Sequence, residues 1–183
     1  SFRGIRDGFP QKASVMSAQL ARKGMTGPPA FFTGQNGLYP LYFKGKYKPE
    51  LLTRDVGTVF EGAFVSYKLW PTCKLTHTYL ESLLGLLAEH KLAANDVVEI
   101  HVVVSEWGRQ LCEPRDVRYR PKTEIAARDS FPFTLGLALE KRSLEINDFV
   151  GEALNDPRIL AAADRVTYAF DPELDPASMS PGN

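Results

Sequence analysis

The sequence predicts an α+β fold, in which helices pack on one side of a small sheet. Residues 97–104 and 166–170 alternate side chains between two faces, which is the period of a β-strand. Apolar side chains at helical spacing are clearest in residues 78–91. The leucines that define this helix are Leu80, Leu83, Leu84 and Leu87. These elements belong to one compact domain, which we place at residues 50–175.

A helical and loop segment, residues 1–49, precedes this domain. Residues 11–23 predict a helix that stops at Gly24, because glycine readily adopts the conformation that follows a helix end. Residues 25–49 are rich in glycine and proline and predict a long ordered loop or short extended pieces. Its aromatic side chains indicate that the loop packs on something, because disordered segments are poor in aromatics. Residues 59–67 then predict a strand.

Capping signals mark the starts of two helices in the main domain. Thr78, with Glu81 three residues later, forms a capping-box pattern at the start of the leucine-rich helix. Asp156 followed by Pro157 is typical of an N-cap with proline at the first helical position. The remaining predicted elements are a helix at 133–139 with Pro132 in its first turn, a short helix at 148–154, a helix that ends at Ala163 and a flexible tail at 176–183.

Composition and charge exclude several classes of protein. The 183 residues carry 22 Lys+Arg and 22 Asp+Glu, so the formal net charge is zero, whereas a nucleic-acid or anionic-membrane binder shows a basic excess. No apolar run reaches the length that spans a bilayer. Cys73 and Cys112 lie far apart and suit reduced thiols in a cytoplasmic protein. The chain opens at Ser1 with neither an initiating methionine nor a signal peptide, so we expect a processed or excised piece.

Motifs of the common cofactor and metal sites are missing from the sequence. It holds no dinucleotide-binding glycine motif, P-loop, HExxH, EF-hand loop or GxSxG. With three histidines and no cysteine cluster, a structural zinc site is not expected. Cys73 and His77 are four residues apart, but nothing supplies the orienting group that a cysteine hydrolase needs. His90 is predicted to lie at a helix end and His101 on the solvated face of a strand.

The segment from 67 to 77 concentrates chemically active side chains where a predicted strand meets a predicted helix. They are Lys68, Cys73, Lys74, Thr76 and His77. Free backbone N–H groups at a helix start, together with two lysines, form a natural cradle for a carboxylate. His77 is placed near the open end, where an imidazole can pass a proton. The alternative is a well-capped loop with solvated lysines and a buried cysteine.

A second candidate is the basic segment 109–128. Six basic side chains occur there with three acidic ones, and the segment therefore carries a local excess of three positive charges in a neutral chain. The basic residues are Arg109, Arg115, Arg118, Arg120, Lys122 and Arg128, and the acidic ones are Glu113, Asp116 and Glu124. Arginine binds carboxylates with two hydrogen bonds, so an acidic substrate is one interpretation. A solvated loop is the other.

Several motifs occur in a fixed order along the chain. They are LARKGMTGP at 20–28, KLWPTCKLTH at 68–77, ARDSFPF at 127–133, LNDPR at 154–158 and RV at 165–166. In this order and spacing the sequence resembles the 2-methylcitrate dehydratase family, the MmgE/PrpD superfamily, over nearly the whole chain. Members of this family include 2-methylcitrate dehydratase, cis-aconitate decarboxylase and iminodisuccinate epimerase.

The resemblance implies a protein of two domains with the active site in the cleft between them. Family members pair a large all-helical domain with a smaller α+β lid domain. Residues 1–49 then correspond to the end of the helical domain and residues 50–175 to the lid. The rest of the helical domain, which brings further histidines and acids to the site, is the implied partner of this chain, so we expect no turnover by the chain alone. A cytoplasmic homodimer is also expected.

The resemblance assigns roles to particular residues. Lys68 and His77 match the family's Lys-x-x-Pro…His motif in the loop that lines the site, and Arg128 belongs to its Ala-Arg-x-Ser-Phe motif. His77 is then expected to transfer a proton or contact a hydroxyl, while Lys68 and Arg128 bind the carboxylates of the substrate. The implied catalytic residues are His77 and Lys68, and the implied substrate-binding residues are Arg128, Ser130, Cys73 and Lys74.

The implied reaction begins with abstraction of a proton alpha to a carboxylate of a small di- or tricarboxylic acid, in propionate metabolism. Loss of the β-hydroxyl makes the enzyme a lyase, specifically a dehydratase; return of the proton to the other face makes it an isomerase. Phe9 stands where decarboxylase-like members have lysine, which disfavours decarboxylation. No metal or organic cofactor is implied, and no nucleic acid or membrane. The alternative to an enzyme is a non-catalytic lid fragment that acts as an interaction module.

Overall fold

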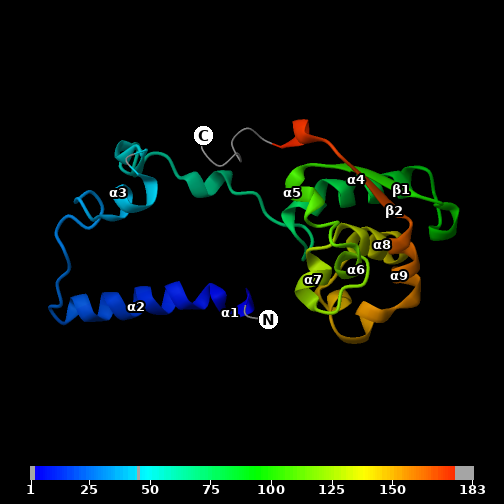
Figure 1. Cartoon of the computed structure of the whole chain (residues 1–183), viewed down its shortest axis with the longest axis horizontal. Helices are drawn as coiled ribbons and strands as arrows, with labels where there is room; N and C mark the ends of the chain where they lie inside the picture. Colours follow the sequence, from blue (N-terminus) through cyan, green and yellow to red (C-terminus); the bar gives the residue numbers. More distant parts are fainter. Residues whose placement is uncertain (1–2, 45, 176–183) are drawn as a thin grey trace. The chain divides into compact units, whose positions relative to one another are not determined.

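A computed structural model describes residues 3–44 and 46–175 of the chain. The predicted tail at 176–183 lies outside the described residues. The chain divides after Val65 into two compact units (Figure 1). We call residues Ser1–Val65 unit 1 and residues Ser66–Asn183 unit 2. The division of the chain into a helical-domain end and a lid that begins at residue 50 remains a prediction.

Unit 1 is built from helices and turns. Its helices are α1 (Arg3–Arg6), α2 (Gly8–Arg22) and α3 (Leu38–Phe43), and 3₁₀ turns follow at Pro49–Leu52 and Glu61–Phe64. The predicted helix at 11–23 is confirmed and begins a few residues earlier. The chain leaves it through Gly24, whose φ of 92° suits glycine because a Cβ would be strained there. Across α2, all of which is described, no side chain is buried.

Aromatic side chains in and around α3 pack on one another. The ring of Tyr39 stacks on that of Phe32 with centres 5.5 Å apart, and it contacts the ring of Tyr47 at 4.8 Å. The N–H groups of Leu38 and Tyr39 donate to the carbonyls of Phe31 and Phe32, which closes the loop. The rings of this segment therefore contact one another, while Phe31, Phe32 and Phe43 remain exposed, and packing on another part of the protein stays a prediction. The predicted loop also contains a short helix, α3.

The predicted strand at 59–67 is wrong. Residues 61–64 form a 3₁₀ turn, and in the described part of the chain the sheet contains only segments that lie later in the sequence. Aromatic and β-branched residues favour a strand only where a neighbouring strand can bond its backbone and pack on its side chains. Residues 59–67 have this composition, but among the described residues they have no neighbouring strand, so their strand propensity led to a wrong prediction.

Unit 2 contains the sheet and the core. Its longer elements are α4 (His77–Glu89), β1 (Ile100–Val104), α8 (Phe131–Lys141), α9 (Pro157–Asp164) and β2 (Val166–Phe170). The short helices are α5 (Glu106–Arg109), α6 (Arg115–Arg118) and α7 (Glu124–Arg128). Turns of 3₁₀ type occur at Lys74–Thr76, Ala94–Asp96, Ile146–Phe149, Gly151–Asn155 and Pro172–Leu174. The α+β class is confirmed, whereas the predicted helix at 148–154 is wrong, because two 3₁₀ turns cover these residues.

The helix starts test the capping signals directly. Asp156 caps α9 by accepting a hydrogen bond from the N–H of Arg158 at 2.9 Å, as predicted. The capping box of Thr78 with Glu81 is wrong, because α4 begins one residue before Thr78. A 3₁₀ turn runs directly into α4, so the N-cap position falls on Thr76.

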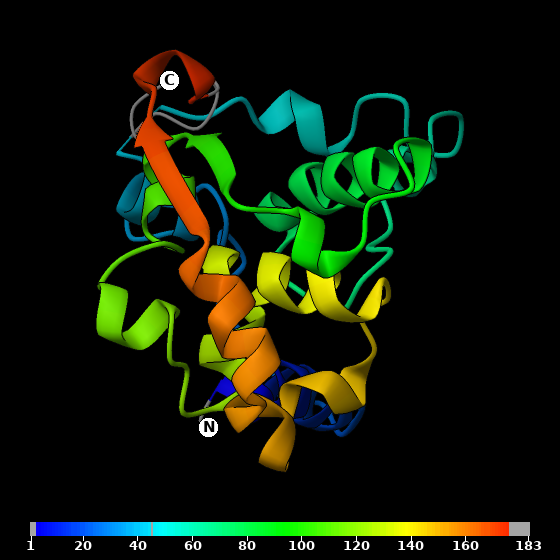
Figure 2. The same cartoon turned by 90° about the vertical axis from the view of Figure 1, so that its right-hand side faces the viewer.

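The two strands form a parallel sheet in which Ile100 lies opposite Val166. Val102 and Val104 of β1 are buried, while the side chain of His101 is exposed on the opposite face, as the alternation predicted. The strands lie side by side in Figures 1 and 2, with α8 and α9 together on one side of them. The predicted strand at 166–170 is confirmed, and the one at 97–104 is shortened to β1.

Two tyrosine hydroxyls donate hydrogen bonds to backbone carbonyls at the outer edges of this two-stranded sheet. Tyr79 of α4 donates to the carbonyl of Val103 at 2.7 Å, and Tyr119, which follows α6, donates to the carbonyl of Val166 at 2.7 Å. The register places both carbonyls on the sides that face away from the other strand. The hydroxyls therefore pair groups that the two-stranded sheet cannot pair, and they attach the sheet to the helices.

Helix α8 forms the centre of the core, and each of residues 131–139 is buried. Its first turn is capped by Ser130, whose Oγ accepts the N–H of Phe133 at 3.0 Å. Where α8 meets α9, a Cβ added to Gly136 lies 2.6 Å from the backbone N of Ala163. Only glycine therefore permits this approach of the two helix backbones.

We expect Gly136→Ala to lower the free energy of unfolding by about 1–3 kcal/mol, because the added methyl group meets the backbone of α9 rather than a movable side chain. Gly85→Ala in α4 is the control, since no described atom lies within 4 Å of its added Cβ. That variant should gain about 0.5–1 kcal/mol from helix propensity. Urea unfolding followed by circular dichroism measures both. Similar stabilities for the two variants would contradict the close contact of α8 with α9.

Candidate active site

The segment from Lys68 to His77 enters α4 through a hydrogen-bonded turn. The buried hydroxyls of Thr72 and Thr76 lie 2.8 Å apart, and Thr76 donates to the carbonyl of Cys73 at 2.8 Å. Because Thr76 uses its hydrogen on Cys73, Thr72 is the donor between the two hydroxyls. The turn is thus held from inside, and Thr72 is a contributor that sequence reasoning missed.

His77 is the first residue of α4, and its side chain is 5% exposed. Its ring lies against the ring of Trp70 with centres 5.3 Å apart, and its Nε2 has no hydrogen-bond partner among the residues that the structure describes. Burial first, and then the charges of Lys74 and Lys68, lower the pKa of the imidazole below 6.5. The ring is therefore neutral at pH 7 and has a nitrogen available to accept a proton.

The N–H groups at the start of α4 are less available than the sequence predicted. The N–H of Thr76 donates to the carbonyl of Cys73 at 3.0 Å, and the N–H of His77 donates to the carbonyl of Lys74. The turn before α4 therefore uses groups that were expected to bind an anion. The positive end of the helix dipole still favours negative charge at this point.

Both lysines of the segment are exposed and bend back onto its backbone. Lys68 Nζ donates to the carbonyl of Thr72 at 2.9 Å, and Lys74 Nζ donates to the carbonyl of Tyr67 at 3.4 Å. An ammonium group has three donors, so each lysine keeps donors for an anionic ligand. Cys73, which lies between the two lysines in the sequence, is half-buried and packs against the core.

An open groove of about 560 Å³ runs beside this segment. It is lined by Lys68, Leu69, Trp70, Pro71, Leu144, Glu145, Ile146 and Asn147. Trp70 belongs both to the groove and to the contact with His77. Its lining combines apolar side chains with the ammonium group of Lys68, the carboxylate of Glu145 and the amide of Asn147, so the groove carries charges of both signs.

Arg128 is brought to the segment, although 57 positions separate it from Pro71. Its Nε donates to the carbonyl of Pro71 at 2.6 Å, and its Nη1 pairs with Glu124 at 2.9 Å. Its own carbonyl accepts the N–H of Cys73 at 2.9 Å. Glu124 is another residue that sequence reasoning did not select, and direct contact of Arg128 with a substrate remains a prediction.

Ser130 lies in the core rather than on the surface of the segment. Its side chain is fully buried, and its hydroxyl donates to the carbonyl of Arg118 at 2.5 Å while it accepts the N–H of Phe133. A serine hydroxyl has one hydrogen, and here Arg118 receives it. The structure thus gives Ser130 a capping role, and its predicted contact with a substrate is not tested.

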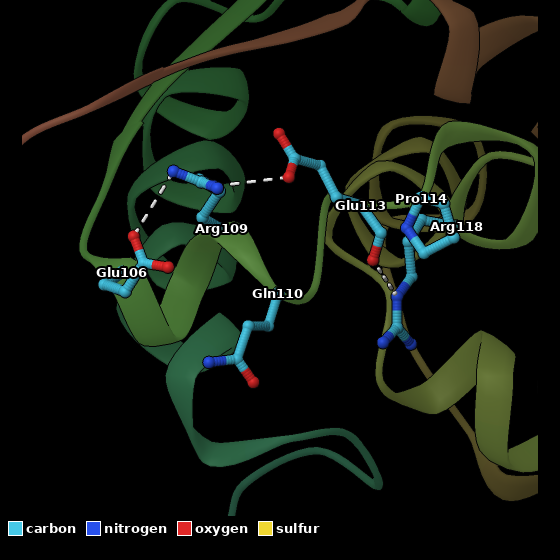
Figure 3. Close-up of a pocket in the computed structure, with 6 residues that line it drawn as sticks. All are labelled: Glu106, Arg109, Gln110, Glu113, Pro114 and Arg118. Carbon is cyan, nitrogen blue, oxygen red and sulfur yellow. Dashed lines mark hydrogen bonds and ion pairs between the residues drawn. The ribbon is translucent and has the colours of Figure 1, made fainter.

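The arginines of the basic segment 109–128 are engaged with protein partners. Figure 3 shows Arg109 between the carboxylates of Glu106, at 3.4 Å, and Glu113, at 3.2 Å. In the same surface pocket, Arg118 donates to the carbonyl of Glu113 at 3.1 Å. Elsewhere Arg120 pairs with Asp164 at 2.5 Å. The local positive charge of the sequence is therefore largely matched inside the domain, which weakens the prediction of a substrate-binding basic loop.

Unit 2 is an α+β domain that presents a neutral histidine and two lysines at a helix start. Residues 70–182 match the family model of the MmgE/PrpD C-terminal domain. The chain therefore belongs to the MmgE/PrpD family and carries its C-terminal domain, as its motifs predicted. No curated protein matches the chain. Within residues 3–44 and 46–175, no helix is long and apolar enough to cross a membrane.

Because the pKa of His77 is lower in the folded protein than the usual 6.5, the unfolded chain binds more protons between these two values. The contribution of the neutral His77 ring to the free energy of unfolding is therefore complete above pH 6.5, and it is lost as the pH falls toward the folded-state pKa. We expect His77→Gln to have a shallower loss of stability than the unmodified chain in this window. Urea midpoints from pH 5 to 7.5 measure the difference, with the exposed His90 changed to Gln as the control. Equal slopes for the unmodified chain and His77→Gln would contradict the shift.

Proposed function

We propose that this chain is part of a 2-methylcitrate dehydratase-like enzyme that acts on a small di- or tricarboxylic acid. One observation supports this proposal above the others: His77 is buried and neutral next to two lysines, and its Nε2 has no hydrogen-bond partner among the residues that the structure describes. A base with a lowered pKa removes a proton alpha to a carboxylate, and nearby cations stabilise the negative charge that develops. Membership of the MmgE/PrpD family supports a dehydratase-like reaction.

In the proposed reaction His77 accepts the alpha proton through Nε2, which no described residue hydrogen-bonds. Lys68 and Lys74 bind the carboxylates, because each ammonium keeps donors beyond its bond to the backbone. The half-buried Cys73 forms part of the wall. Departure of the β-hydroxyl completes a dehydration, for which the protonated imidazole can supply the proton that the leaving hydroxyl needs.

The remaining parts of the proposed enzyme come from outside this domain. A helical domain of the same protein would cover the His77 segment, exclude water and add further acid–base groups. Exclusion of water strengthens the attraction between the lysines and the substrate carboxylates, because the local dielectric constant falls. A homodimer in the cytoplasm belongs to the same proposal.

An epimerase of the same family is the first alternative, since it uses the same base and differs only in the face to which the proton returns. An interaction module without activity is the second. The exposed apolar side chains of α2 favour it, among them Val15, Met16 and Leu20. Assay of the complete gene product on 2-methylcitrate, citrate, cis-aconitate and iminodisuccinate separates the three, because each class yields a different product or none.

We expect His77→Ala in the complete gene product to reduce turnover by about 10²–10⁴-fold, because the proton acceptor is lost. His90→Ala, which changes an exposed histidine at the end of α4, is the matched control and should retain the unmodified rate. Steady-state kinetics on the substrate identified by the assay measure both. Turnover within a few-fold of the unmodified enzyme for His77→Ala would remove His77 from the mechanism.

A further inference from the structure

Two hydrogen bonds join the end of α7 to the segment that precedes His77, and a third lies within α7. The side chain of Arg128 donates to the carbonyl of Pro71 and to Glu124, and the backbone carbonyl of Arg128 accepts the N–H of Cys73. Two of these bonds reach residues on either side of the buried Thr72. The segment is therefore held at two successive points by one residue from a distant part of the chain.

Each of these two points is connected to His77. Pro71 follows Trp70, whose ring lies against the imidazole. The carbonyl of Cys73 accepts the hydroxyl of Thr76, the residue immediately before His77. Movement of the Pro71 carbonyl would therefore shift the ring that shields His77, and movement of Cys73 would shift the start of α4.

We propose that Arg128 is a positioning residue that, oriented by Glu124, holds the segment from Trp70 to Thr76 against His77 and so keeps the imidazole shielded from water. This inference rests on the proposed function, because a shielded His77 matters to catalysis only if His77 transfers the proton. It differs from the family-based expectation, in which Arg128 binds a substrate carboxylate. A positioning role requires Glu124 to stay paired with Arg128, whereas a substrate-binding role requires the guanidinium to be free for the substrate.

The geometry of the guanidinium explains why this position requires arginine. Nε points to the carbonyl of Pro71 while Nη1 pairs with the carboxylate of Glu124, so one planar group makes bonds in two directions. A lysine has a single nitrogen on a flexible stem and cannot reproduce both bonds in fixed directions. Arg128→Lys therefore preserves the charge and removes the clamp.

Loss of the Glu124 charge shifts the pKa of His77 in opposite directions, depending on whether Glu124 acts on His77 through its charge or by orienting Arg128. Removal of its negative charge would by itself lower the pKa of His77, because a cation is less stable with fewer anions nearby. If Glu124 instead orients Arg128, its loss loosens the segment and lets water reach His77. Relief of desolvation, the largest cause of the lowered pKa, then raises the pKa and outweighs the loss of the Trp70 and Thr72 backbone hydrogen bonds, which favour the protonated ring. The other charged groups that act on His77, Lys68 and Lys74, are unchanged in the Glu124→Gln variant.

The experiment is an NMR titration of the His77 imidazole together with hydrogen exchange of the Cys73 amide, in the 183-residue chain. The variants are Arg128→Lys, which keeps the charge, and Glu124→Gln. The matched control is Arg120→Ala, which removes another arginine that pairs with a carboxylate and bonds backbone carbonyls. Chemical shifts of α8 and α9 report whether each variant is folded.

In Arg128→Lys and Glu124→Gln we expect the pKa of His77 to rise toward 6.5 and the Cys73 amide to exchange at least ~10-fold faster, with no change in Arg120→Ala. An unchanged or lowered pKa with unchanged exchange in both variants would overturn the proposal. These measurements need no substrate, so they remain decisive if the proposed dehydratase activity is not found. If it is found, a positioning role lowers kcat by about 10–100-fold with little change in KM, whereas a substrate contact raises KM.

Discussion

The close contact between α8 and α9 at Gly136 is the constraint on which the rest of unit 2 depends. It lets the first nine residues of α8, 131–139, lie buried inside the domain. The N–H of Phe131 then bonds the carbonyl of Leu111, and Ser130 bonds the carbonyl of Arg118, so the chain just before α8 is fixed to the core. Arg128 lies at the end of α7 in this fixed stretch. The position of the helix in the core thereby determines where the guanidinium meets the His77 segment.

The chemistry of the site follows from partial burial. His77 lies where α4 meets the core, so its ring loses water without gaining a hydrogen-bond partner for Nε2 among the described residues. Desolvation and two nearby lysines favour the neutral imidazole. The lysines themselves remain exposed and can bind an anion. The segment from Lys68 to His77 therefore combines a histidine that burial keeps neutral with two lysines that are exposed to an anionic ligand.

Arginine has a structural use in this domain that its sequence did not reveal. Much of unit 2 is coil and short helix, and such backbone leaves carbonyls without partners in regular structure. Arg118 donates to the carbonyls of Glu113 and Asp129, and Arg165 donates to those of Ala94 and Val97. A guanidinium is suited to this task because it carries donors in several directions and remains charged. A cluster of arginines in the sequence can therefore mark loops that are tied together rather than a site for an acidic ligand.

The sequence by itself determined the elements whose signals are local, and it determined the family. The spacing of the leucines in α4, the proline in the first turn of α8, the cap of α9 and the alternation in β2 all act within one turn or strand, so their pattern can be read along the chain. The order of the motifs placed the chain in the MmgE/PrpD family and pointed to the segment from Lys68 to His77.

Tertiary structure alone decided the rest. It gave residues 59–67 no partner strand among the described residues, buried His77 beside Trp70, and used Arg128 to hold Pro71 across 57 positions. The physical reason is common to these cases. Whether a backbone carbonyl, an imidazole or a strand edge finds a partner or meets water depends on which distant segment packs against it, and local sequence patterns carry no record of that neighbour.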